Sequence, residues 1–145
     1  MDAALNAVKQ ETIRKYEQSF ADKQNMAYAV IQALNHVINN SSDTTIQALY
    51  EQLKSCSDHL LDSMHSNPEL GDRTLLSIQC LIKIYFRMAQ KVDYEQNISE
   101  IKSTIHMKGI NLAQHTLQVN ALIRNFAEPH LREGMVSEQV ILSAI

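Results

Sequence analysis

Apolar residues recur at helical spacing along most of this 145-residue chain. In the first stretch, Asp2 can cap a helix whose apolar positions follow three- to five-residue spacing as far as Phe20. A polar break at 22–25 leads into a second apolar stripe at 26–38, which has a clear helical period. The pattern therefore predicts one amphipathic helix on each side of the break.

Two more helices are predicted in the middle of the chain. The third starts at Asp43 or Thr44, and Asn67-Pro68 stops it because the residue before a proline avoids helical angles. The fourth, from about 72 to 90, carries apolar side chains on nearly all sides. A helix of this kind must be buried on most faces, so we expect it to be the central helix of the fold.

A fifth, longer helix is predicted from Tyr94 to Ala127, with Asp93 as its cap. Its apolar residues recur every seven positions, a spacing typical of close packing along a partner helix. These positions are Ile98, Ile105, Leu112, Val119 and Phe126. Gly109 falls inside the helix and costs about 1 kcal/mol of helix propensity. We therefore expect the helix to bend there, or another backbone to approach closely.

The helical pattern ends at Pro129, and the tail carries a short apolar run at 140–142 that predicts a buried β-strand. Such a strand has no pairing partner in a helical chain. With only three Gly and two Pro, the composition favours long helices. We predict an all-α bundle of about five helices over 1–134. Residues 135–145 are then a linker and the first strand of a further domain.

Charge is distributed unevenly along the chain. The net charge of −3 does not suggest a nucleic-acid partner. Residues 1–72 hold five Lys/Arg against ten Asp/Glu, whereas residues 73–145 hold eight against six. The basic excess forms either a solvated helix face or a weakly basic surface that meets an acidic or phosphorylated partner. Most of it comes from Lys83, Arg87, Lys91, Lys102 and Lys108.

The chain carries no signal of a membrane or secreted protein. No apolar run reaches the roughly 18 residues that a membrane span needs, and the N-terminus lacks an apolar core of the signal-peptide type. Cys56 and Cys80 each lie in an apolar helical pattern and read as small core residues in a reducing compartment. A soluble, cytoplasmic protein that does not bind a membrane is expected.

Motifs for catalysis and metal binding are missing from the sequence. The six His residues are spread over separate helices, without HExxH or Cys-x-x-Cys spacing. No Gly-rich phosphate loop or nucleophile elbow is found. Asp58 and Asp62 share a helix face, either as a coupled carboxylate pair or as part of an acidic solvent face. We predict no catalytic residue, no metal and no cofactor.

Four short segments resemble the alpha subunit of eukaryotic translation initiation factor 2B, the guanine-nucleotide exchange factor that reloads initiation factor 2. MAYAV at 26–30 is similar to an MA-x-AV run of that family, and TTIQAL at 44–49 is similar to its ETIQGL segment. LIKIYFRM at 81–88 matches an apolar helix with a basic residue, which in the family also precedes an Asp-Tyr pair, here Asp93-Tyr94. Leu131 to Gly134 match an aliphatic, a basic, an acidic and a Gly residue.

The chain also departs from the family. Residues 119–123 read Val-Asn-Ala-Leu-Ile where the family has Ser-Arg-Asn-Lys-Ile, and the region between Asp93 and Gly109 is longer. None of the matching segments is a catalytic signature. The resemblance, which covers nearly the whole chain, is that of a divergent member.

The resemblance implies a function. Family members carry a helical N-terminal domain, followed by a Rossmann-like domain that mediates dimerisation and can hold a sugar phosphate. The helical domain helps recognise initiation factor 2 when its alpha subunit is phosphorylated, so that the exchange factor is inhibited in the integrated stress response. By resemblance, this chain is a regulatory, non-catalytic subunit domain. Its partners are the other exchange-factor subunits and the phosphorylated alpha subunit, and the full-length protein is a homodimer through the missing domain.

The resemblance singles out four partner-binding residues. Thr45 matches a family Thr whose alteration disturbs sensing, but it also suits a helix cap, since backbone N–H groups are free at a helix start. Lys83 matches a basic residue near the partner-facing groove, or it simply extends from its helix to solvent. Ile13 and Tyr16 lie on the first helix, which in the family is close to the partner, and core packing is their other role.

Two other functions remain open. The chain can be the N-terminal piece of a related sugar-phosphate isomerase, whose catalytic residues lie mainly in the missing part. It can also be a helical scaffold unrelated to translation, in which residues 140–145 pack as a helix or fray.

Overall fold

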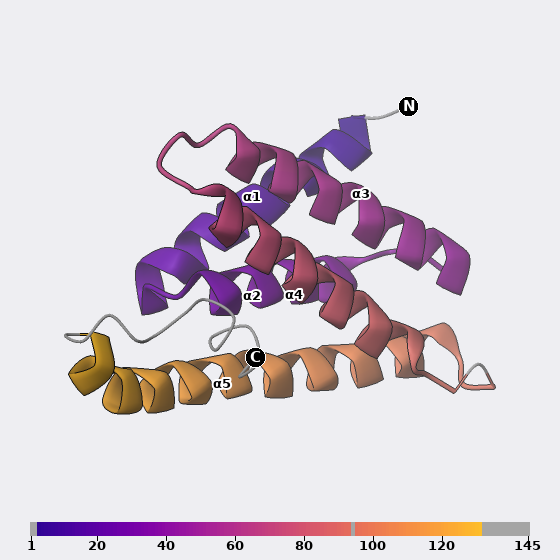
Figure 1. Ribbon diagram of the computed structural model, residues 1–145. Coiled ribbons are helices and arrows are strands. Elements are labelled where there is room, and N and C mark those ends of the chain that lie inside the picture. The colour runs from indigo at the N-terminus through magenta and orange to yellow at the C-terminus, as the bar shows by residue number, and fades with distance from the viewer. Residues whose placement is uncertain (1–2, 94, 132–145) are drawn as a thin grey trace.

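Five α-helices form a bundle in the computed structural model, which describes residues 3–93 and 95–131 (Figure 1). They are α1 (Ala3–Lys23), α2 (Met26–Asn40), α3 (Ile46–His65), α4 (Asp72–Gln90) and α5 (Ile98–Leu131). The predicted all-α fold is confirmed, and no strand occurs among the described residues. The expected cap at Asp2, the expected strand at 140–142 and the expected linker at 135–145 lie outside them.

Helix α2 is the central element of the bundle. It packs against each of the other four helices, and nine of its fifteen residues are buried. Ala29 and Ala33 are fully buried, and their small side chains let neighbouring helices approach closely. The prediction that 72–90 is the central helix is wrong. Helix α4 has more apolar residues than its buried face can hold, so Leu76 stays 55% and Ile84 38% exposed.

The start of α3 also differs from the prediction. Thr45, and not Asp43 or Thr44, is the N-cap, because its side-chain Oγ1 accepts a hydrogen bond of 3.1 Å from the backbone N–H of Ala48. Asp43 instead accepts a bond of 2.8 Å from the hydroxyl of Ser41 within the loop. Several residues of this loop are suitable caps by type, and the turn geometry decides among them.

Helix α5 starts later than the sequence suggested. Asn97 caps it by accepting a bond of 2.9 Å from the backbone N–H of Glu100. The predicted cap, Asp93, accepts from the N–H of Glu95 and so closes a short turn before the helix. At its other end, α5 continues two residues past Pro129 to Leu131. The proline therefore lies in the last turn, where it removes one helical hydrogen bond.

At Gly109 of α5 the side chain of Asn35 in α2 lies very close to the helix backbone. A Cβ built on Gly109 would lie 1.9 Å from Oδ1 of Asn35, so no other residue fits without movement. The sequence predicted a bend or the close approach of another backbone at this glycine, but the space is filled by the side chain of Asn35. Asn35 uses that proximity to donate a 2.9 Å hydrogen bond from Nδ2 to the carbonyl of His106.

Candidate functional site

Two hollows lie next to each other between α3 and α4. Their volumes are about 310 and 620 Å³, and both are lined by Lys54 and Phe86. We call their combined lining the α3–α4 groove. It extends from Ile46 and Gln90 at one end to Leu61 and Gln79 at the other.

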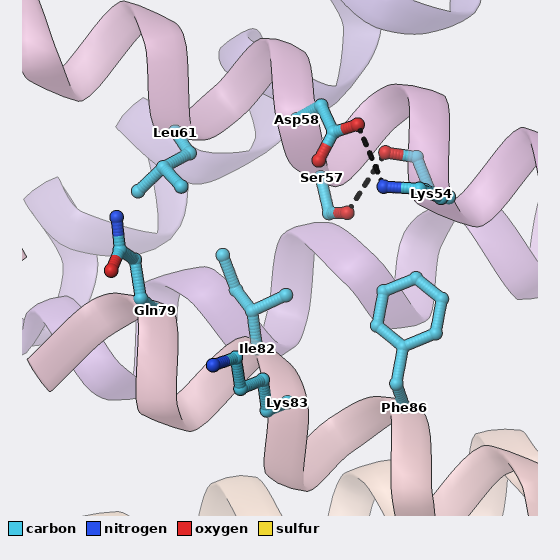
Figure 2. A pocket seen from close by; sticks show the side chains of 8 residues that line it. All are labelled: Lys54, Ser57, Asp58, Leu61, Gln79, Ile82, Lys83 and Phe86. Carbon is cyan, nitrogen blue, oxygen red and sulfur yellow. Dashed lines mark hydrogen bonds and ion pairs between the residues drawn. The ribbon is translucent and has the colours of Figure 1, made fainter. Parts of the chain in front are cut away.

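The groove is apolar inside and carries charge along its edges. Figure 2 shows Leu61 directed toward α4, and Ile82 and Phe86 directed toward α3. On the α3 side, Lys54 forms a 3.2 Å ion pair with Asp58. On the α4 side, Lys83 is exposed and forms no ion pair or hydrogen bond with the described residues. An apolar trough beside a cation without an ion pair is suited to binding an amphipathic chain.

The groove forms because one face of α3 and of α4 is buried in the core while the positions beside that face are only partly covered. One face of each helix is buried in the core, with Leu53 of α3 and Leu81 of α4 at most 2% exposed. The flanking positions, Tyr50 and Phe86 among them, are only partly covered and form the walls. The hydroxyl of Tyr50 donates a 2.8 Å bond to the carbonyl of Ala89, which fixes the spacing of the two helices at that end.

Of the four residues singled out by the sequence, one lines this groove and a second lies next to its end. Lys83 lines it, and Thr45 directly precedes Ile46, which lines it at the other end. The capping role of Thr45, one of its two expected roles, is confirmed by the hydrogen bond to Ala48. The hydroxyl group of Thr45 is therefore already used as the cap of α3, and the next residue, Ile46, lines the groove.

The other two residues lie elsewhere. Ile13 and Tyr16 belong to α1, which packs against α2 and α3, and both side chains are partly buried against the core. The ring of Tyr16 stacks on Phe20, with centroids 6.2 Å apart, and burial raises the pKa of Tyr16. Core packing, the alternative expected for both residues, is what the contacts show, and neither lines the groove.

Sequence reasoning missed the role of Lys102. Its ammonium group donates to the backbone carbonyls of Ser41 and Asp43 at 2.9 and 2.7 Å. These bonds tie the loop before α3 to α5 and hold Thr45 in place. In the sequence, Lys102 read only as part of the basic excess, and no local pattern links it to a loop about 60 residues away.

A further hollow of about 310 Å³ lies among α1, α2 and α3, and its lining includes Glu11, His36 and Gln52. Glu11 is paired with Arg14, which lowers the pKa of Glu11. His36 lies 3.4 Å from the same carboxylate. Burial nevertheless lowers the pKa of His36, so the ring is neutral near pH 7. Gln52 also lines the hollow, but its Oε1 is enclosed without a partner. A ligand in the hollow could not reach that atom.

The described residues contain no arrangement for metal binding. No group of three or more His, Cys, Asp or Glu side chains is close enough to hold a metal ion in this part of the chain. Asp58 is paired with Lys54, as expected for an acidic solvent face.

None of the helices in the described ranges is both long and apolar enough to cross a membrane. Comparison with protein-family models, curated proteins and solved structures finds no match.

Proposed function

We propose that this chain is the helical domain of a regulatory subunit in a guanine-nucleotide exchange factor for translation initiation factor 2. The domain helps sense the phosphorylated alpha subunit of initiation factor 2 and so regulates translation initiation. The proposal starts from the resemblance of segments 26–30, 44–49 and 81–88 to the alpha subunit of initiation factor 2B. One observation supports it further. Lys83, from one of these segments, lines the α3–α4 groove, and Thr45, from another, caps the helix whose first residue, Ile46, lines the groove at its other end.

The mechanism is differential binding without chemistry. The groove supplies apolar contact through Ile82 and Phe86, and Lys83 supplies a positive charge that no described acid neutralises. A phosphorylated partner that binds here better than the unphosphorylated one shifts the whole complex toward an inhibited arrangement. The phosphate acts either by direct contact with the groove or by reshaping the partner's own loop.

The rest of the proposal follows from the family. The domain has no catalytic role, it works in the cytoplasm, and it assembles with the other subunits of the exchange factor. A Rossmann-like domain following this one would make the homodimer. The competing assignment, a sugar-phosphate isomerase, requires a phosphate pocket and an acid/base pair in that following domain.

The direct test is retention of the partner. The full-length protein is immobilised, and the phosphorylated and unphosphorylated alpha subunits of initiation factor 2 are applied in parallel. We expect the phosphorylated form to be retained at least about fivefold better, the lower end of typical coupling between sites. Equal retention of the two forms would remove the sensing function.

A further inference from the structure

Helix α4 and the residue after it carry a block of positive charge. Between Asp72 and Asp93 the chain has Arg73, Lys83, Arg87 and Lys91 and no acidic residue, although the net charge of the whole chain is −3. The three basic side chains within α4 are all exposed. None of them forms an ion pair or a side-chain hydrogen bond with the residues that the structure describes.

Four other basic side chains of the bundle set a contrast, although Lys9, Lys15 and Lys23 of α1, like the cations of α4, form no ion pair with the described residues. Arg14 and Lys54 are paired with acids in their own helices, while Lys102 and Lys108 donate to backbone carbonyls. These cations have a partner within the fold. The cations of α4 do not, and their charge is available to a molecule outside it.

Apolar side chains are interleaved with these cations on the outer face of α4. Two of the three large hydrophobic residues that are exposed in the described chain, Leu76 and Ile84, lie in this helix. The positions of the face repeat at steps of three and four residues, the spacing that aligns side chains along a neighbouring helix. We call this face the α4 stripe, and it consists of Arg73, Leu76, Cys80, Lys83, Ile84 and Arg87.

We propose that the α4 stripe is a docking surface for an acidic amphipathic helix of a partner protein. Leu76 and Ile84 would contact the partner's apolar row, and Arg73, Lys83 and Arg87 would meet Asp or Glu side chains on either side of that row. Exposed apolar residues beside unpaired cations favour a partner that is both apolar and acidic.

A second copy of this chain fits the stripe poorly. Two stripes face to face would bring three unpaired cations from each copy together, with no acid of α4 between them beyond the terminal Asp72. Like charges placed opposite each other at an interface typically cost several kcal/mol. The charge pattern therefore disfavours a dimer formed by two α4 stripes. A polyanion without apolar groups, such as single-stranded RNA, would leave Leu76 and Ile84 uncovered.

This inference goes beyond the proposed function and does not depend on it. The α4 stripe shares Lys83 with the α3–α4 groove, but Arg73, Leu76 and Arg87 do not line the groove. The test therefore leaves Lys83 unchanged and uses no translation factor. Failure here would leave the partner-retention experiment unaffected.

Cys80 supplies a reporter within the stripe. It is partly exposed, whereas Cys56, the other cysteine, is fully buried. The probe is a synthetic helix of about three heptads, with Leu at positions a and d and Glu at e and g. The rate of Cys80 alkylation by N-ethylmaleimide is measured with and without the probe, and probe affinity is measured by fluorescence anisotropy. Modification of Cys56 reports any unfolding.

We expect the saturating probe to slow Cys80 alkylation by at least about fivefold, as a covered face requires. Arg73→Glu together with Arg87→Glu should weaken probe binding by about tenfold or more. The matched control, Lys15→Glu together with Lys23→Glu on α1, changes the net charge by the same amount and should leave affinity within about twofold. A probe with Lys in place of Glu should give no protection.

Four results would overturn the proposal. The first is no protection of Cys80 by the Glu probe. The second is equal protection by a scrambled peptide of the same composition, and the third is an equal loss of affinity in the α1 control, since both indicate diffuse charge attraction. The fourth is stronger protection by a uridine oligonucleotide, or by raising the concentration of the protein alone, because the occupant is then RNA or a second copy.

Discussion

Tyr85 of α4 donates a 2.6 Å hydrogen bond to Oδ1 of Asn35 in α2, and both residues are at most 2% exposed. The same Asn35 amide donates from Nδ2 to the carbonyl of His106 in α5. One buried side chain thus joins three helices through an acceptor and a donor that are both used. Buried polar groups are expensive unless they are paired, so this junction favours one relative placement of α2, α4 and α5.

The first prediction concerns Gly109, which makes room for that amide. Gly109→Ala would place a methyl group 1.9 Å from Asn35 Oδ1, so the amide must move and its two hydrogen bonds are strained or lost. We expect the free energy of unfolding to fall by about 2 kcal/mol, since overpacking and lost bonds outweigh the gain in helix propensity. Urea denaturation followed by circular dichroism measures it.

Gly71→Ala is the control, because a Cβ there meets nothing within 4 Å. It should cost at most about 1 kcal/mol, because Gly71 is the N-cap of α4, where Ala is less favoured than Gly, and it should leave the bonds of Asn35 intact. Combining Gly109→Ala with Asn35→Ala should cost less than the sum of the two single changes, since the clash needs both side chains. Strict additivity would show that Gly109 is required for some other reason.

The second prediction concerns pH and Tyr85. Burial raises the pKa of Tyr85, so above about pH 10 the unfolded chain loses this proton while the folded chain keeps it. The free energy of unfolding must therefore fall as pH rises past that value, by at most about 1.4 kcal/mol per pH unit from this group. Tyr85→Phe should flatten the decline, and at neutral pH it should cost about 1–3 kcal/mol because Asn35 Oδ1 loses its donor. If the free energy of unfolding declined equally with pH in the unaltered protein and in Tyr85→Phe, the raised pKa would not belong to Tyr85.

The third prediction separates the two roles of Thr45. Thr45→Ala removes the acceptor for the N–H of Ala48 and should cost about 1 kcal/mol of stability, whereas Thr45→Ser should keep the cap. Thr45→Lys should show the same structural loss as the Ala variant. If Thr45→Ser binds the phosphorylated partner normally while Thr45→Ala does not, at matched folded fractions, the hydroxyl group of Thr45 is what the partner requires; equal binding by all three proteins would leave Thr45 as a structural cap only.

The fourth prediction tests the anchoring of the loop before α3. Lys102→Met keeps the length of the side chain but removes the donors to the carbonyls of Ser41 and Asp43. We expect a loss of about 1–2 kcal/mol and faster amide hydrogen exchange across residues 41–48. Lys108→Met is the comparison, because Lys108 bonds a single exposed carbonyl, that of Lys91. It should cost about 0.5 kcal/mol and leave exchange at 41–48 unchanged.

The spacing of apolar residues predicted the existence of the helices and, for α4, also its bounds. Helix α4 has the predicted bounds, since a polar segment and Gly71 precede it and the apolar run ends at Gln90. Helix starts were harder. Asp93 and Asn97 are both good cap residues, and so are Asp43 and Thr45, so the choice depends on how each loop closes.

Contacts between residues that are far apart in the sequence could not be predicted from the spacing of apolar residues. The pattern of α4 suggested the central helix, but burial is decided by what packs around a helix, and the small residues of α2 admit more neighbours. For the same reason the bonds from Lys102 to the α3 loop and from Asn35 to Tyr85 could not be predicted. Of the candidate site residues, Lys83 was placed by resemblance, and the groove around it needed the structure.

The central claim is that the α3–α4 groove helps distinguish phosphorylated from unphosphorylated alpha subunit of initiation factor 2. Its most direct measurement is the ratio of the two dissociation constants, determined for the full-length protein, for Lys83→Ala and for the exposed α1 control Lys23→Ala. We expect Lys83→Ala to reduce the ratio by about threefold or more, and Lys23→Ala to leave it unchanged. A ratio of one in the unaltered protein, or the same ratio in all three proteins, would contradict the account.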